Sequence, residues 1–236
     1  MKAIILAAGL GTRMQKAYPG IPKVMLPIGG KPLLEQTINH LKKFGFDEVF
    51  VNLHYFPDVI KNYFADGKKF GVKIIYSYEP KILGTAGALI NFKKYLDKTF
   101  AVIYGDVFTT LNFKKFLEFH KEKKSQTTLL VHETDHPEDS DLVAIDKQGR
   151  ILKFYLKPHK KLPTDTNLSS AAIYLLEPAI LKFLPKKIPA DFLEDFFPFL
   201  LRKKFKLFGY LSHEYTKDIG TPERYRKVLE YDQKYG

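Results

Sequence analysis

Glycine and basic residues follow the first apolar segment of the chain in a pattern that suits phosphate binding. Residues 3–7 are apolar and lead directly to Gly9 and Gly11, and the basic Arg13 and Lys23 come next. Glycine can take positive φ and has no Cβ, so a loop of this composition lets backbone N–H groups come close to an anion. The two basic side chains would add positive charge at the same place. The loop is therefore a candidate phosphate site, although a structural tight turn would also explain two glycines.

Two better-known glycine loops do not match this segment. The segment lacks the third glycine of the dinucleotide-binding fingerprint, and it lacks the Gly-Lys-Ser/Thr ending of a Walker loop.

Polar residues with possible roles in chemistry also follow later apolar segments. Glu79 precedes a proline, Gly84 and Thr85 open a predicted helix, and Asp106 follows the apolar residues 100–104. A carboxylate directly after a buried strand is well placed to hold a hard divalent cation against phosphate oxygens. Simpler alternatives remain open. Glu79 could be a surface residue, and the other three could cap helices.

The hydrophobic pattern predicts the elements that would position these residues. Apolar or β-branched segments alternate with amphipathic segments over residues 1–130, which is typical of a three-layer α/β fold with a parallel sheet. Ligands of such sheets bind beyond the carboxyl ends of the strands, where the candidate residues fall. Later strands lie closer together, which predicts a mixed extension. We expect strands at 3–6, 48–53, 72–76, 100–104, 127–132, 141–146, 150–157, 169–176 and 206–211, and helices at 33–44, 57–64, 85–96, 112–123, 178–183, 191–203 and 221–235.

Composition excludes several classes of protein. The 236 residues, 45% of them hydrophobic, suit one large α/β domain over residues 1–236. No apolar run is long enough to span a bilayer and the N-terminus does not resemble a signal peptide, so we expect a cytoplasmic protein with no membrane partner. The absence of cysteine excludes disulfides and thiolate chemistry. The net charge of +12 comes from dispersed lysines, which indicates attraction of anionic substrates rather than nucleic-acid binding.

The residues around the glycine loop closely resemble a known family. The string Ala-Ile-Ile-Leu-Ala-Ala-Gly-Leu-Gly-Thr-Arg, followed by Pro-Lys-Val-Met-Leu-Pro-Ile-Gly-Gly-Lys-Pro-Leu-Leu, is similar to the N-terminal signature of sugar-1-phosphate nucleotidyltransferases. Asp-Ile-Gly-Thr-Pro-Glu-Arg-Tyr, which contains Asp218, resembles the C-terminal metal motif of that family. The resemblance implies a Rossmann-like fold of the glycosyltransferase-A type, with a nucleotide-binding half (1–130) and a sugar-phosphate-binding half (131–236).

The resemblance also implies roles for particular residues. Arg13 and Lys23 would bind the phosphates, and Asp106 and Asp218 would bind Mg²⁺; these four are the expected catalytic residues. The nucleotide would contact Leu6, Ala8, Gly9, Gly11, Thr12, Arg13, Glu79, Gly84 and Thr85, and the sugar phosphate would contact Asp141, Lys157 and Ser170.

The segment Leu-Gly-Thr-Ala-Gly-Ala-Leu resembles the guanylyltransferase form of the family, and Glu79 offers a physical basis for that choice. A carboxylate can accept hydrogen bonds from N1–H and N2–H₂ of guanine, whereas uracil and thymine present one donor flanked by carbonyl oxygens. GTP is therefore the expected nucleotide.

The sugar half departs from the family pattern. Leu156 replaces the glutamate of Glu-Lys-Pro, Ser140-Asp141 stands in place of Tyr-Gly, and Ser170-Ala-Ala172 stands in place of Asn-Ala-Gly. Residues 136–143 and 157–159 resemble a subgroup of guanylyltransferases linked to heptose metabolism, which favours mannose or manno-heptose 1-phosphate as acceptor. Two alternatives remain: a regulatory subunit that binds nucleotide sugars without turnover, and a cytidylyltransferase for a choline or polyol phosphate. We expect a monomer or homodimer.

Overall fold

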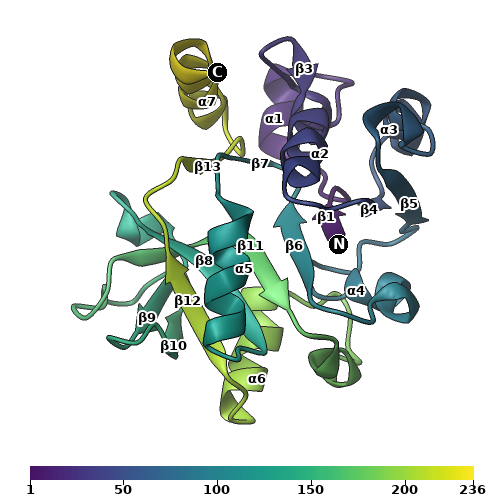
Figure 1. The fold of residues 1–236 in the computed structure, drawn as a ribbon. Helices are drawn as coiled ribbons and strands as arrows, with labels where there is room; N and C mark the ends of the chain where they lie inside the picture. The colour runs from purple at the N-terminus through teal and green to yellow at the C-terminus, as the bar shows by residue number, and fades with distance from the viewer. The chain divides into compact units, whose positions relative to one another are not determined.

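A computed structural model describes residues 1–236, which Figure 1 draws as a ribbon. The chain forms two compact units, each built from separate stretches of sequence. Unit 1 comprises Met1–Ile82, Ile103–Leu111 and Glu214–Gly236, and unit 2 comprises Leu83–Val102 and Asn112–His213. Strand β6 (Phe100–Tyr104) runs from unit 2 into unit 1. The single domain with halves 1–130 and 131–236 stays a prediction.

Unit 1 is organised around parallel strands. Strand β4 (Glu48–Leu53) pairs with β1 (Lys2–Leu6) on one side and with β5 (Lys73–Tyr78) on the other, and Asn52 lies opposite Leu6. The β1 residues 3–5 are completely buried. Because β1, β4 and β5 run parallel, their carboxyl ends lie at one edge of the sheet, which is where ligands bind in this type of fold. Helices α2 (Leu33–Lys43) and α3 (Pro57–Phe64) connect these strands.

Further elements of unit 1 pack around Met14, which lies in helix α1 (Thr12–Ala17). Helix α7 (Pro222–Tyr235) begins at Pro222 because the Thr221 hydroxyl accepts a hydrogen bond from the Arg224 N–H. One buried apolar cluster joins Met14 of α1 to Ile219, Tyr225 and neighbouring residues. The remaining elements of unit 1 are α1 (Thr12–Ala17), β2 (Pro27–Ile28), β3 (Lys31–Pro32), β7 (Val107–Thr109), β13 (Thr216–Asp218), α7 (Pro222–Tyr235) and 3₁₀ turns at Lys23–Met25 and Lys68–Phe70.

The strands of unit 2 pair in both parallel and antiparallel directions. Strand β8 (Thr127–Glu133) pairs antiparallel with β11 (Leu168–Leu176) and parallel with β12 (Leu207–Leu211). Strands β9 (Leu142–Ile145) and β10 (Ile151–Tyr155) form an antiparallel hairpin. The other elements are α4 (Leu89–Phe92), α5 (Phe113–Glu122), α6 (Phe197–Arg202), a π-helical turn at Phe192–Phe196 and 3₁₀ turns at Lys93–Tyr95, Pro137–Asp139 and Pro178–Phe183.

The expected α/β fold with a central, mostly parallel sheet is confirmed. The helix expected at 85–96 is wrong in its first part, because the helical residues start only at Leu89. Thr85 and Ala86 instead bond to residues 190–192. This long-range contact overrides the local helical pattern.

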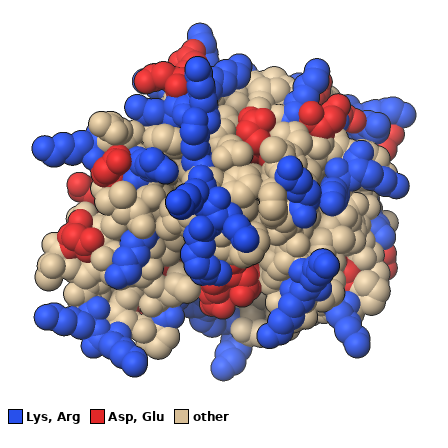
Figure 2. Space-filling model, turned by 90° about the horizontal axis from the view of Figure 1, so that it is seen from below, with Lys and Arg blue, Asp and Glu red and all other residues tan.

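No helix has both the length and the apolar character needed to cross a membrane. Basic side chains are spread over the face seen in Figure 2, with acidic side chains among them. The cytoplasmic location, the oligomeric state and the absence of a nucleic-acid partner stay predictions.

Candidate functional site

The glycine loop follows β1, as the sequence indicates. Gly11 has a φ of 62° and precedes α1, whereas Gly9 does not take positive φ. A Cβ built on Gly9 would meet no atom within 4 Å, so its backbone is open to a close approach. Leu6 ends β1 and Ala8 is buried, while Thr12 and Arg13 are exposed at the start of α1. The loop therefore leaves backbone and a guanidinium accessible to an anion.

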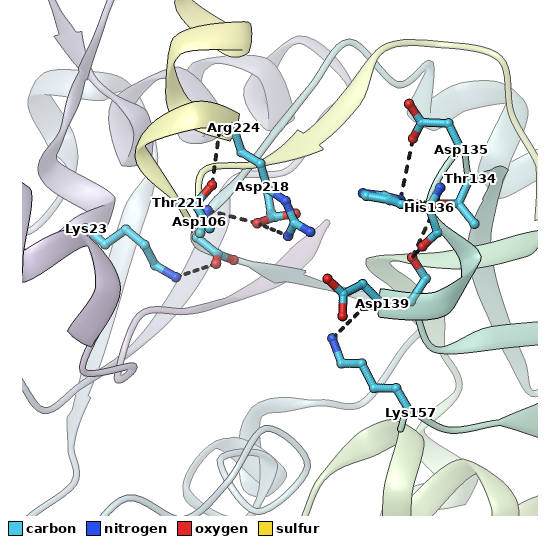
Figure 3. A network of polar contacts seen from close by, with 12 residues as sticks. Lys23, Asp106, Thr134, Asp135, His136, Asp139, Lys157, Asp218, Thr221 and Arg224 are labelled. Atoms are coloured by element: carbon cyan, nitrogen blue, oxygen red, sulfur yellow. Dashed lines mark hydrogen bonds and ion pairs between the residues drawn. The ribbon is translucent and has the colours of Figure 1, made fainter. Parts of the chain in front are cut away.

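Lys23 and Asp106 form an ion pair in unit 1 (Figure 3). The stem of Lys23 also packs next to Gly11, since a Cβ built there would lie 3.4 Å from the Lys23 Cβ. Asp106 is held at this place by Gly105, whose N–H donates to the Leu6 carbonyl over 2.8 Å. A Cβ at Gly105 would approach the same carbonyl to 2.8 Å, so only glycine allows Asp106 to follow the end of β1 so closely.

Asp218 lies beside Asp106 because β7 and β13 form a short antiparallel ribbon. In this ribbon Asp218 is opposite Val107, and the Ile219 N–H donates to the Asp106 carbonyl over 2.8 Å. The Arg224 guanidinium donates from Nη1 to both carboxylate oxygens of Asp218, at 3.0 and 2.9 Å (Figure 3). The two aspartates that are far apart in sequence therefore meet at one place, as predicted.

The environment of Asp218 favours its charged form. Burial acts to raise the pKa of this carboxyl, but the Arg224 charge, the hydrogen bond from the Gly220 N–H and the Lys23 charge together hold the pKa below its ordinary value. Arg13 approaches the same turn, since a Cβ built on Gly220 would lie 3.5 Å from the Arg13 Nη2. Basic and acidic side chains thus alternate around the end of β1.

The carboxylates of Asp106 and Asp218 fit a hard divalent cation. Both are oxygen donors, and Mg²⁺ is typically bound through one or two carboxylates together with substrate phosphates. No group of three or more His, Cys, Asp or Glu side chains gathers as a metal cluster, so the remaining ligands would have to come from phosphate oxygens and water. Each carboxylate is paired with a cationic side chain that would have to adjust.

Glu79 is not a surface residue, because only 1% of it is exposed. It directly follows β5, and its carboxylate Oε1 accepts a hydrogen bond from the Asn52 side-chain amide over 2.8 Å. Asn52 in turn accepts from the Ala7 N–H at the start of the glycine loop. The structure therefore connects the predicted base-recognition carboxylate to the predicted phosphate loop.

Gly84 and Thr85 lie in unit 2, where they contact residues 190–192. The Thr85 hydroxyl donates to the Asp191 carboxylate over 2.6 Å and accepts from the Phe192 N–H over 3.0 Å. Gly84 has a φ of 81°, and a Cβ there would lie 2.3 Å from the Ala190 carbonyl oxygen. Neither residue caps the helix that follows, so that alternative is wrong. The backbone contact alone requires glycine at position 84.

The three predicted sugar-phosphate residues lie together in unit 2. The Lys157 N–H donates to an Asp141 carboxylate oxygen over 3.0 Å, and the Ser170 N–H lies 3.5 Å from the Asp141 carbonyl oxygen. The Lys157 Nζ donates to the Asp139 carbonyl over 3.0 Å, and this lysine is otherwise exposed (Figure 3). The lysine charge is therefore accessible to an anion, but its role stays a prediction.

Sequence reasoning missed Asn52 and Arg224. Asn52 could have been found, because it is a polar residue among the buried apolar residues 49–53 near the end of β4, and such a residue must find buried partners. Arg224 gave no comparable signal, since its contact with Asp218 depends on how the turn at 219–221 folds back.

Known proteins resemble this chain over nearly its whole length. The UTP–glucose-1-phosphate uridylyltransferase of Synechocystis is 35% identical over 97% of the chain, which spans 62% of that protein. The D-glycero-alpha-D-manno-heptose 1-phosphate guanylyltransferase of Campylobacter jejuni is also 35% identical over 97% of the chain, which here spans 99% of the relative.

A solved structure, that of HddC from Yersinia pseudotuberculosis complexed with GMP-PN, is 30% identical and superposes with a TM-score of 0.80 over 98% of both chains. The family model described as "Nucleotidyl transferase" matches residues 2–234. This chain therefore belongs to the nucleotidyl transferase family.

Proposed function

We propose that this protein transfers a nucleotidyl group from a nucleoside triphosphate to a sugar 1-phosphate and releases pyrophosphate. The observation that carries the proposal is the cluster of Lys23, Asp106 and Asp218 beside the glycine loop. This cluster combines cationic groups for phosphates with two carboxylates suited to a divalent metal. Names of the Synechocystis and Campylobacter relatives agree with this reaction class.

The chemistry needs positioning and charge neutralisation rather than a protein nucleophile. A phosphate oxygen of the sugar 1-phosphate attacks the α-phosphorus in line, its bond to that phosphorus forms, and the bond to the pyrophosphate leaving group breaks. The acceptor phosphate is already ionised near neutral pH. Residues 9–13 would bind the triphosphate, and Lys23 would bind near the α-phosphate, where negative charge builds up.

Asp106 and Asp218 would hold Mg²⁺, which when bound would neutralise charge on the α-phosphate and on the leaving pyrophosphate. The low pKa of Asp218 supports this role, since a metal ligand must be deprotonated.

GTP is the proposed nucleotide because Glu79 is buried beside the phosphate loop. A buried carboxylate that meets two guanine donors keeps its hydrogen bonds, whereas uracil would leave an acceptor unmatched at a cost of about 1–3 kcal/mol. The guanylyltransferase from Campylobacter, which this chain spans almost completely, supports this choice. The uridylyltransferase from Synechocystis is equally identical to the chain, so the base must be tested directly.

A manno-configured hexose or heptose 1-phosphate is the proposed acceptor. Lys157, Asp141 and Ser170 lie together and would contact the sugar phosphate. The name of the Campylobacter relative includes a manno-heptose 1-phosphate, which agrees with this assignment.

Pyrophosphate release tests the proposal. GTP, ATP, CTP, UTP and dTTP would each be combined with mannose, manno-heptose, glucose and N-acetylhexosamine 1-phosphates in the presence of Mg²⁺. We expect release with GTP and a manno-configured acceptor. Tight nucleotide binding without release from any pair would favour a non-catalytic subunit, and release with UTP alone would contradict the assignment of Glu79.

A further inference from the structure

The side chain of Asn52 joins the residues that follow two different strands. Asn52 belongs to β4, and its side chain is almost completely buried, with 3% of the residue exposed. Its Oδ1 accepts from the N–H of Ala7, the first residue after β1, and its Nδ2 donates to Glu79, the first residue after β5; both distances are 2.8 Å. One amide on the middle strand thus spans the carboxyl ends of all three.

The orientation of this amide is fixed by its partners. The Ala7 N–H can only donate, so the Asn52 oxygen must face it, and the amide nitrogen must then face Glu79. The side chain of Asn52 therefore presents a donor to Oε1 of a carboxylate. Backbone bonds hold the main chain at the same place, since the Glu79 N–H donates to the Leu53 carbonyl and the Glu79 carbonyl bonds with the His54 ring.

We propose that Asn52 is a positioning residue that selects the nucleotide base by fixing the orientation of the Glu79 carboxylate. This inference rests on the proposed function, in which Glu79 meets the two adjacent donors of guanine. A carboxylate has about four lone-pair sites, and the Asn52 donor takes one of them on Oε1.

The hydrogen bond from the Ala7 N–H gives Asn52 a second effect, on the phosphate loop rather than on the choice of base. Loss of the acceptor for the Ala7 N–H would disturb the phosphate loop, and that disturbance weakens the binding of every nucleoside triphosphate. Loss of the donor to Glu79 acts only on the discrimination between bases. A disturbed phosphate loop weakens the binding of UTP and GTP alike, so its effect cancels in the ratio of their dissociation constants. A change in that ratio therefore reports the effect of the substitution on Glu79.

Asn52→Leu removes both polar contacts at a similar side-chain size, and Asn52→Ala provides a second variant if the larger side chain prevents folding. Asn39→Leu is the matched control, because Asn39 lies in α2 and its amide also approaches a glutamate, Glu35, at 3.5 Å. Thermal melting confirms that each variant is folded. Isothermal titration calorimetry then gives the dissociation constants of GTP and UTP, and steady-state kinetics gives KM and kcat.

For Asn52→Leu we expect the preference for GTP over UTP to fall about tenfold, mainly through the KM for GTP, which corresponds to about 1.4 kcal/mol. In a Glu79→Gln background, the same substitution should change the preference by less than about twofold, because Asn52 acts through Glu79. Asn39→Leu should leave the preference unchanged.

Each result separates the inference from the proposed function. If Glu79→Gln erodes the preference and a folded Asn52 variant does not, Asn52 has no role in selecting the base, although Glu79 does. If Asn52→Leu lowers the preference equally in the Glu79→Gln background, Asn52 does not act through Glu79 and the inference is also wrong. If Glu79→Gln leaves the preference unchanged, the base assignment of the proposed function fails and the inference fails with it.

Discussion

Ala172 takes a backbone conformation that is costly for alanine, and replacing it with glycine should stabilise the protein. Its φ is 56°, and it lies where the pairing register of β11 shifts between Ser170 and Tyr174. The left-handed conformation costs a residue with a Cβ roughly 1–2 kcal/mol. Glycine avoids this cost but loses about 0.5–1 kcal/mol of chain entropy on folding. The net expectation for Ala172→Gly is a gain of about 0.5–1 kcal/mol in the free energy of unfolding.

Thermal unfolding measures this gain directly. For a protein of about this size, 1 kcal/mol shifts the Tm by about 2–4 °C, so Ala172→Gly should raise the Tm by about 1–4 °C. Ala171→Gly is the matched control, because Ala171 is the adjacent buried residue without positive φ, and it should lower the Tm. If both substitutions lower the Tm by similar amounts, Ala172 is not strained in the folded protein.

Other predictions concern the site and the pH dependence of stability. Asp106→Asn should abolish Mg²⁺-dependent pyrophosphate release while the Tm stays within a few degrees, and near-normal release would remove Asp106 from the metal site. Lys157→Met should raise the KM for the sugar 1-phosphate at least about tenfold with little change in the KM for the nucleotide, since a charge-assisted contact contributes about 1.5–3 kcal/mol; equal effects on both substrates would contradict the acceptor role. His120 is buried between Thr128 and Glu177, and burial lowers its pKa despite the nearby Glu177 carboxylate. The folded protein therefore resists protonation of this ring, so the stability contribution is present above the unfolded pKa of about 6.5 and is lost as the pH falls below it. Chemical unfolding between about pH 7.5 and 5 should show this decline, and His120→Gln should reduce its slope; an identical slope in the variant would exclude His120 as a source.

The positions of single elements were predictable because the signals are local. Strand β1 is an apolar run that ends at a glycine loop, and helix α7 begins with a Thr-Pro pair that caps its first turn. The same local logic placed Asp106 at the end of β6. Functional residues that directly follow a strand or helix with a clear sequence pattern can therefore be predicted from sequence.

Contacts that depend on distant segments were not predictable from local patterns, and it was the family resemblance that led us to expect Asp106 and Asp218 at one site. Strands β7 and β13 have three residues each, too few for a periodic signal, yet their pairing brings Asp218 to Asp106. Thr85 belonged to an apparently helical segment, but its hydroxyl bonds to Asp191, 106 residues away. In both cases the energy comes from tertiary pairing, which no local pattern records.

The proposed activity of this protein is the synthesis of a nucleotide sugar. The most direct test is to incubate it with GTP, Mg²⁺ and a manno-configured sugar 1-phosphate and to quantify the nucleotide sugar by mass spectrometry alongside pyrophosphate. We predict equal amounts of GDP-sugar and pyrophosphate, and neither product from Asp106→Asn. Pyrophosphate without any nucleotide sugar, or binding of GTP without either product across all acceptors, would contradict the proposed activity.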